Sequence, residues 1–143
     1  MKWSLFINKE KEEEILIYAH EENDLVKDII SLVALQDKTI NGIYNDEIQL
    51  ITPSLVSCFI SENNKVYALI NDKKYLIKKR LYQIEEMMDE SFLKINQSCL
   101  VNRKKIVKFQ ASIGGSLMVI LDNGYKDYVA RRELKNIKQR MGL

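Results

Sequence analysis

Residues 92–106 read FLKINQSCLVNRKKI, and this stretch decides the fold. Its first strand places Leu93 and Ile95 on one face and Lys94 and Asn96 on the other, which is the period-two pattern of a half-buried strand. A short polar turn ends this strand, and an apolar step followed by a basic run leads to the next one. The stretch therefore predicts short strands joined by tight turns.

The chain on both sides of this stretch continues the β pattern. Before it, the sequence predicts a meander of three short strands, at residues 56–61, 65–70 and 74–78. A helix follows, with apolar side chains at one-turn spacing, at Leu81, Ile84 and Met88. After the stretch come three strands separated by glycine-containing turns, at residues 106–111, 117–121 and 125–130. Residues 131–141 are expected to end the chain as an amphipathic, basic helix.

The first 52 residues show a different pattern. Two short strands are predicted, at residues 3–8 and 14–20. Asn23 is then expected to cap a helix that ends near Gln36. Short strands at residues 39–44 and 48–51, with Asn41-Gly42 as the turn signal, lead to the single proline, Pro53.

Composition and charge limit the classes of protein to which the chain can belong. The 143 residues are 46% hydrophobic and 29% charged, which fits one ordinary globular domain with an appendage. Residues 1–52 carry 5 basic and 11 acidic side chains, whereas residues 53–143 carry 17 and 9. A basic half of this kind is typical of a protein with a polyanionic partner. We expect no membrane span or secretion signal, a cytoplasmic location, and buried, reduced side chains for Cys58 and Cys99.

Catalytic chemistry is almost absent from the sequence. The one histidine, His20, ends a predicted strand in the acidic part of the chain, with no cysteine or serine partner nearby. No phosphate-binding loop, zinc spacing or nucleophile motif occurs. The sequence therefore predicts a protein that is not an enzyme and that needs no cofactor and no metal.

Two motifs resemble the signature of LytTR-type DNA-binding domains. The first is Ser98 followed by Val101-Asn102, and the second is the closing run of residues 128–132, which ends in Arg131-Arg132. With the meander and helix before them, these motifs occur in the order and spacing of the family across roughly residues 46–143. The resemblance implies an α+β fold, mainly β, in which a LytTR-like sheet domain at 46–143 follows a strand-strand-helix appendage at 1–45.

The resemblance also implies which residues touch DNA. Carried over by position, three side chains read bases in the major groove: Lys65, Gln97 and Arg132. Candidates for phosphate contacts are Lys94, Asn96, Ser98, Lys104, Arg131 and Lys135, and Asn102 is expected to close a turn as a structural residue. Arginine and glutamine are suited to guanine and adenine respectively, and lysine to guanine or a phosphate. The sequence departs from the family at Asn96-Gln97, Cys99 and Ala130, which bears on base preference.

The expected function is sequence-specific binding of duplex DNA at repeated sites by a bacterial transcription regulator. The chain is similar to small stand-alone LytTR regulators that lack a receiver domain, some of which are restrained by a small membrane protein. Three roles stay open for residues 1–45: packing on the domain, formation of a homodimer, and docking of such an inhibitor. The alternative function is a protein-interaction module with little DNA binding, and salt dependence separates the two.

Overall fold

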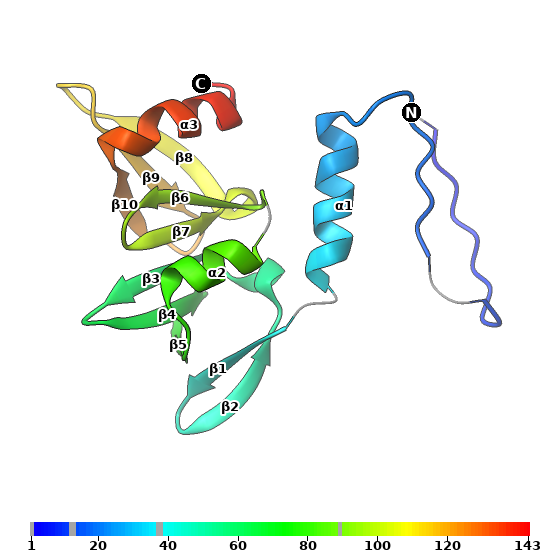
Figure 1. Ribbon diagram of the computed structural model, residues 1–143, viewed down its shortest axis with the longest axis horizontal. Coiled ribbons are helices and arrows are strands. Elements are labelled where there is room, and N and C mark those ends of the chain that lie inside the picture. The colour runs from blue at the N-terminus through cyan, green and yellow to red at the C-terminus, as the bar shows by residue number, and fades with distance from the viewer. Residues whose placement is uncertain (1, 12–13, 37–38, 89) are drawn as a thin grey trace.

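The computed structural model describes residues 2–11, 14–36, 39–88 and 90–143 (Figure 1). The helices in these ranges are α1 (Asp24–Gln36), η1 (Pro53–Leu55), α2 (Leu81–Met87), η2 (Arg103–Lys105) and α3 (Arg131–Met141). The strands are β1 (Ile40–Tyr44), β2 (Glu47–Ile51), β3 (Cys58–Glu62), β4 (Lys65–Ile70), β5 (Lys73–Ile77), β6 (Phe92–Asn96), β7 (Cys99–Asn102), β8 (Ile106–Ala111), β9 (Leu117–Leu121) and β10 (Lys126–Val129). The expected α+β class, mainly β, is confirmed.

Seven antiparallel strands form the larger sheet, in the order β2-β1-β5-β4-β3-β7-β6. The predicted meander forms β3, β4 and β5, joined by tight turns. The sequence pattern did not separate β7 as a strand, yet β7 is the element that attaches residues 92–106 to the meander. It does so by pairing with β3, with Phe59 opposite Leu100. The stretch that decides the fold therefore extends the meander into one continuous sheet.

Three strands form a smaller sheet in the order β10-β9-β8. Gly114 and Gly115 make the turn between β8 and β9 with positive φ angles of 100° and 86°, so the predicted glycine turn is confirmed. The amide N–H of Ala130, just after β10, donates to the carbonyl of Ile95 in β6 at 2.7 Å. This bond ties the smaller sheet to the outer strand of the larger one.

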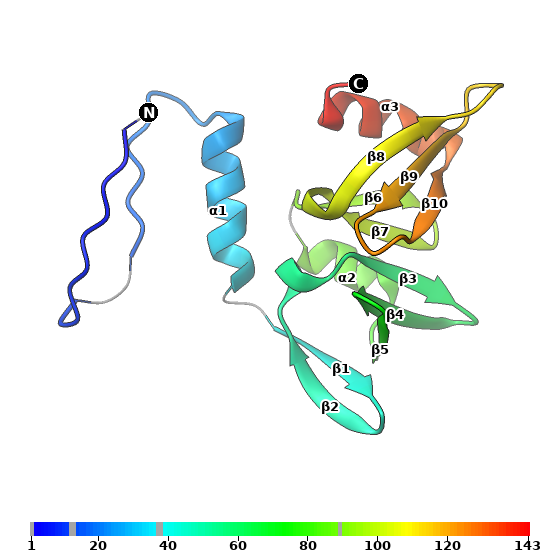
Figure 2. The ribbon, with the colours of Figure 1, turned by 180° about the vertical axis from the view of Figure 1, so that it is seen from behind.

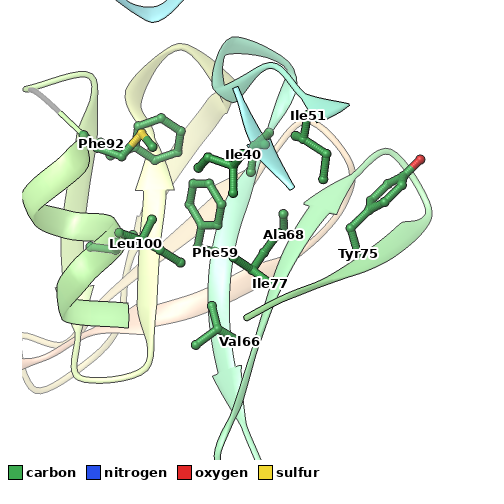
Figure 3. Close-up of a cluster of buried hydrophobic side chains, with 12 residues drawn as sticks. Ile40, Ile51, Phe59, Val66, Ala68, Tyr75, Ile77, Phe92 and Leu100 are labelled. Atoms are coloured by element: carbon green, nitrogen blue, oxygen red, sulfur yellow. The ribbon is translucent and has the colours of Figure 1, made fainter. Parts of the chain in front are cut away.

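The larger sheet buries a separate core on each face. On one face Ile84 of α2 and Met88, directly after α2, pack over a cluster around Phe59, which Figure 3 shows beside Phe92 and Leu100. The Phe59 and Phe92 rings are 5.3 Å apart between centroids. On the other face, side chains of β3, β6 and β7 pack against β9, β10 and the fully buried Ile137 of α3. The strict alternation of β3 produces this division, because successive side chains point to opposite faces.

The two cysteines lie side by side in the second core. Both are reduced and fully buried, as the sequence predicts. In the register of β3 and β7, Cys58 is opposite Val101 and Cys99 is opposite Ile60, so the cysteines are diagonal neighbours on one face. Contact with the Cys58 thiol, and then burial, raise the pKa of Cys99 well above its ordinary value. Cys99 is therefore a packed, neutral thiol.

Gly42 lies inside a strand, so the turn predicted at Asn41-Gly42 is wrong. The chain reverses three residues later, at Asn45 and Asp46, which have positive φ angles of 49° and 62°. Asparagine and aspartate tolerate this backbone region better than most residues. Gly42 is needed for a different reason, because a Cβ atom at this position would overlap the side chain of Ile51.

The residues before α1 do not form the two predicted strands. Residues 2–8 and 14–19 are extended, but the two runs do not pair as strands, and most of their side chains are exposed. Two extended runs that form a ribbon without a covering layer have marginal stability in water. No strand or helix in the described ranges covers residues 2–8 and 14–19. The predicted helix is confirmed: α1 begins after Asn23, whose side chain accepts from the N–H of Val26 at 3.0 Å.

The sheet begins before the expected domain boundary. The resemblance implies a boundary between residues 45 and 46, and β1 (Ile40–Tyr44), which precedes it, lies between β2 and β5 in the larger sheet. Ile40 is 2% exposed and belongs to the α2-side core. The larger sheet therefore extends to residue 40. Among the described residues, no helix is long and apolar enough to cross a membrane.

Candidate nucleic-acid interface

Three turns that are distant in sequence meet at one end of the sheet. They are the β3–β4 turn at residues 63–65, the β6–β7 turn at 97–98, and the start of α3 at 130–132, and we call this surface the turn edge. Figure 1 shows all three on the left side of the molecule. The N–H of Ser61 donates to the carbonyl of Ser98 at 2.8 Å, which fixes the first turn against the second. The bond from Ala130 to the carbonyl of Ile95 fixes the third.

Each turn presents one of the predicted base-reading residues. Lys65, Gln97 and Arg132 are all exposed. Their side chains have no hydrogen bond or ion pair with another residue in the described part of the chain. A guanidinium, an amide and an ammonium group therefore lie at one edge, ready to bind groups outside the protein.

The start of α3 concentrates positive charge where a helix disfavours it. Arg131 and Arg132 occupy the first turn, next to the partial positive charge of the helix N-terminus. Ala130 at the cap position offers no side-chain oxygen, and Glu133 is the one acidic residue in that turn. An external anion would relieve this arrangement. Lys135, on the next turn of the same helix, is exposed as well.

The structure separates Lys104 from the other predicted phosphate contacts. Lys104 lies in η2, directly after β7, whereas the turn edge lies at the opposite end of the β6–β7 hairpin. Ser98 lies on the turn edge and is exposed. Lys94 lies midway along β6, half-exposed, with its ammonium group 3.9 Å from the carboxylate of Glu85. Of these three residues, Ser98 alone lies at the turn edge itself.

Asn96, which is a predicted phosphate contact, is buried and hydrogen-bonded inside the protein. It is 3% exposed, and its amide nitrogen donates to the carbonyl of Tyr128 at 2.9 Å. Its amide oxygen accepts from the N–H of Ser98 at 2.8 Å. Both ends of the side chain are thus used inside the protein, where they hold Gln97 and Ser98 in place.

Asn102 holds the other end of the β6–β7 hairpin. Its amide nitrogen donates to the carbonyl of Val56 at 3.0 Å, and its amide oxygen accepts from the N–H of Lys104 at 3.1 Å. It is 3% exposed and caps η2. Two buried asparagines therefore set the shape of the hairpin, one at each end.

A basic run that was not predicted from the sequence borders the turn edge. Lys78, Lys79 and Arg80 follow β5, and β5 ends opposite the start of β4, with Ile77 paired to Val66. All three basic residues are exposed, and together with Lys65 they line a groove of about 400 Å³. The sequence does contain a signal for this basic surface, namely three consecutive basic residues between a strand and a helix. Only the pairing of β4 with β5 brings the run next to the β3–β4 turn.

The candidate site contains no obvious metal chemistry. Among the described residues, no group of three or more histidine, cysteine, aspartate or glutamate side chains is placed to hold a metal ion. The arrangement offers hydrogen-bond donors and positive charge on a rigid edge, which suits recognition of a polyanion with distinct base edges.

Comparison with known proteins finds relatives that are named as transcriptional regulators. The chain is 37% identical to a protein named as an HTH-type transcriptional regulator of Staphylococcus aureus strain MSSA476, over 100% of this chain and 99% of that protein. It is 36% identical, with the same coverage, to one so named in strain NCTC 8325. In the present structure five strands separate α2 from α3, so those two helices do not form a helix-turn-helix unit.

A solved structure has the same fold. The LytTr DNA-binding domain of a putative methyl-accepting/DNA response regulator from Bacillus cereus superposes with a TM-score of 0.70 at 18% sequence identity, over 75% of this chain and 99% of that domain. The sequence profile of the LytTr DNA-binding domain matches residues 46–142. That family consists of DNA-binding domains and is not an enzyme family. Its profile covers more than half of the chain, and the chain belongs to the LytTR DNA-binding domain family.

Proposed function

We propose that the protein is a cytoplasmic bacterial transcription regulator that binds duplex DNA sequence-specifically through the turn edge. The observation that carries this proposal is the convergence of three exposed, unpaired polar side chains from three separate turns: Lys65, Gln97 and Arg132. Family membership and the transcriptional-regulator names of the relatives support the same function.

Each of the three side chains recognises a different group on the DNA, because their hydrogen-bonding chemistry differs. Arg132 donates two parallel hydrogen bonds to O6 and N7 of a guanine, and Gln97 pairs with N6 and N7 of an adenine. Lys65 donates to a guanine or to a phosphate, because its ammonium group has no fixed plane. Arg131, Lys135 and Ser98 hold phosphates on either side and set the register without reading sequence.

The basic run at residues 78–80 extends the same footprint. It follows the strand that pairs with β4, so its three charges continue the basic surface that Lys65 begins. Contacts with phosphates at this point add affinity for any duplex and make binding dependent on salt.

One domain of this size offers few phosphate contacts, and we propose that two copies bind repeated half-sites as a homodimer. Two linked sites bind with far higher avidity than one. The resemblance to small stand-alone regulators also implies a small membrane protein as an inhibitor, to which we assign no surface.

The test is selection of bound sequences from a pool of random duplexes at two salt concentrations. The full chain should enrich a repeated motif, and Arg132→Ala should lose preference at one position of each repeat. Lys104→Ala is the matched control, because this exposed lysine lies away from the turn edge and should leave the motif unchanged. Failure to enrich any motif, with bulk binding that merely falls with salt, would show that the turn edge does not read sequence.

A further inference from the structure

The residues before α1 form an exposed arm that stands apart from the domain. Within residues 2–11 and 14–23, residues 2–8 and 14–19 are extended and lie side by side, with α1 between them and the sheets (Figures 1 and 2). The turn edge lies on the far side of the molecule in both views. We refer to residues 2–23 as the arm, of which residues 12 and 13 lie outside the description.

The arm exposes more apolar surface than a monomeric protein usually does. Trp3, Phe6 and Tyr18 are 85%, 89% and 91% exposed, and four further large apolar side chains are exposed too, at Leu5, Ile7, Ile15 and Leu16. The three aromatic side chains alone offer about 500 Å². A stable interface buries about 800 Å² on each partner, so the arm holds most of what one needs. Exposed apolar patches of this size mark interaction sites.

The charged side chains of the arm indicate which kind of partner it binds. The run 2–11 carries three lysines and one glutamate, whereas the run 14–23 carries three glutamates and no lysine or arginine. Each run of one arm is therefore complementary in charge to the opposite run of an identical arm. DNA and an anionic lipid surface would each be repelled by the glutamates of the second run.

The backbone of the arm also fits a second arm. Neither run has strand pairing, so both present free N–H and C=O groups along an edge. The run 15–18 reads Ile-Leu-Ile-Tyr, which is rich in residues favoured in strands. Two copies related by a two-fold axis cover each other's apolar side chains and satisfy these edges at the same time.

We propose that the arm binds the arm of a second copy, with the basic run of one copy against the acidic run of the other. This assignment rests on the dimer of the proposed function and names its contact surface. Because the arm and the turn edge lie on opposite sides of α1, the contact leaves both DNA-binding surfaces open. The arm thus supplies the linkage by which two half-sites are bound together.

The first test measures mass in solution without DNA. Sedimentation of the full chain at tens of micromolar should give about twice the monomer mass of 16.8 kDa. The double variant Trp3→Glu, Phe6→Glu should sediment as a monomer, with at least a tenfold weaker self-association. Its melting temperature at a concentration where both proteins are monomeric should not change, because both side chains are exposed in the single chain. The control is Ile113→Glu, at a fully exposed apolar position in the β8–β9 turn, which should remain dimeric.

The second test reverses the charges of one run at a time. One variant changes Lys2, Lys9 and Lys11 to Glu, and the other changes Glu14, Glu21 and Glu22 to Lys. Each variant alone should be monomeric, whereas an equimolar mixture should form a one-to-one dimer. A full chain that stays monomeric up to about 100 µM, or an arm variant that still dimerises, would overturn the proposal. So would a mixture that fails to associate.

A third measurement separates this proposal from the proposed function. The Trp3→Glu, Phe6→Glu variant should bind a duplex with a single half-site as the full chain does. It should lose at least tenfold in affinity for a duplex with two half-sites. Equal affinity of both proteins for the two-site duplex would count against the arm as the dimer contact. If the full chain did not bind the single-site duplex, that result would count against the turn edge and not against the arm.

Discussion

Arg132 is the residue whose replacement best separates base reading from charge. We expect Arg132→Ala to weaken binding to the selected site by about 1–3 kcal/mol and to relax preference at one base pair. Affinity for a scrambled duplex should fall much less, because base contacts are made only on the correct sequence. Titration of both duplexes with labelled DNA measures the difference. An equal loss on both sequences would assign Arg132 to a phosphate.

Asn96 and Gln97 are neighbours, but we expect replacement of Asn96 to lower the stability and replacement of Gln97 to leave it almost unchanged. Asn96→Ala removes the bonds to Tyr128 and Ser98 and leaves two part-buried backbone groups without these partners. We expect it to lower the free energy of unfolding by about 1–3 kcal/mol in urea denaturation. Gln97→Ala, at an exposed position, is the control and should change that free energy by less than about 0.5 kcal/mol. Equal stability of the two variants would refute the structural role of Asn96.

The burial of Asn96 could not be predicted from the sequence because of a local irregularity in the strand pairing. Strict alternation grouped Asn96 with Lys94 on the polar face. The register of β6 with β7 shifts between these two residues, so that Lys94 is opposite Leu100 but Asn96 is opposite Cys99. A bulge of this kind changes the direction of the side chains after it, and the pattern of residue types does not reveal it.

At the scale of elements, the basic run after β5 is expected to act on every DNA sequence alike. The double variant Lys78→Ala, Lys79→Ala should weaken binding to specific and scrambled duplexes by the same factor. The slope of log affinity against log salt should become less steep by about 0.9 for each phosphate that the variant no longer neutralises. Lys126→Ala, an exposed lysine at the start of β10, is the control. An unchanged slope in the double variant would remove residues 78–80 from the footprint.

The strands of the domain could be predicted from local sequence because each satisfies its own pattern. The predicted bounds of β4, β8, β9 and α3 coincide with the structure. The arm shows the opposite case: its alternating side chains suit a strand, but a strand also needs a neighbour and a covered face. Asn41-Gly42 likewise has the composition of a turn, and contact with Ile51 from the next strand explains the glycine instead. These are tertiary requirements, which no single segment contains.

At the scale of the whole molecule, the sequence predicted the candidate DNA-binding residues one by one but not their grouping. The resemblance supplied Lys65, Gln97 and Arg132 as separate positions along the chain. Their common edge depends on β7 pairing with β3 and on the end of β10 meeting β6. The same pairings place Lys104 at the opposite end, although it is only seven positions from Gln97 in sequence. Distance along the chain is a poor guide to position on a hairpin.

The start of the domain gives a test of the sheet as one cooperative unit. A chain that begins at residue 46 keeps the whole length matched by the family profile but lacks β1, which lies between β2 and β5. Loss of β1 removes buried Ile40 and the ladder bonds to both neighbours, and it leaves β2 without a partner strand.

We expect the 46–143 chain to have a free energy of unfolding at least about 3 kcal/mol below that of a 39–143 chain, from burial of one isoleucine and several net hydrogen bonds. Urea denaturation of the two chains measures the difference, and both lack α1 and the arm, so their comparison isolates β1. Stabilities within about 0.5 kcal/mol of each other would mean that β1 and β2 lie outside the cooperative fold. The expected difference would show that β1 and β2 belong to the same cooperative unit as the rest of the sheet, because a sheet that loses an internal strand loses the outer one with it.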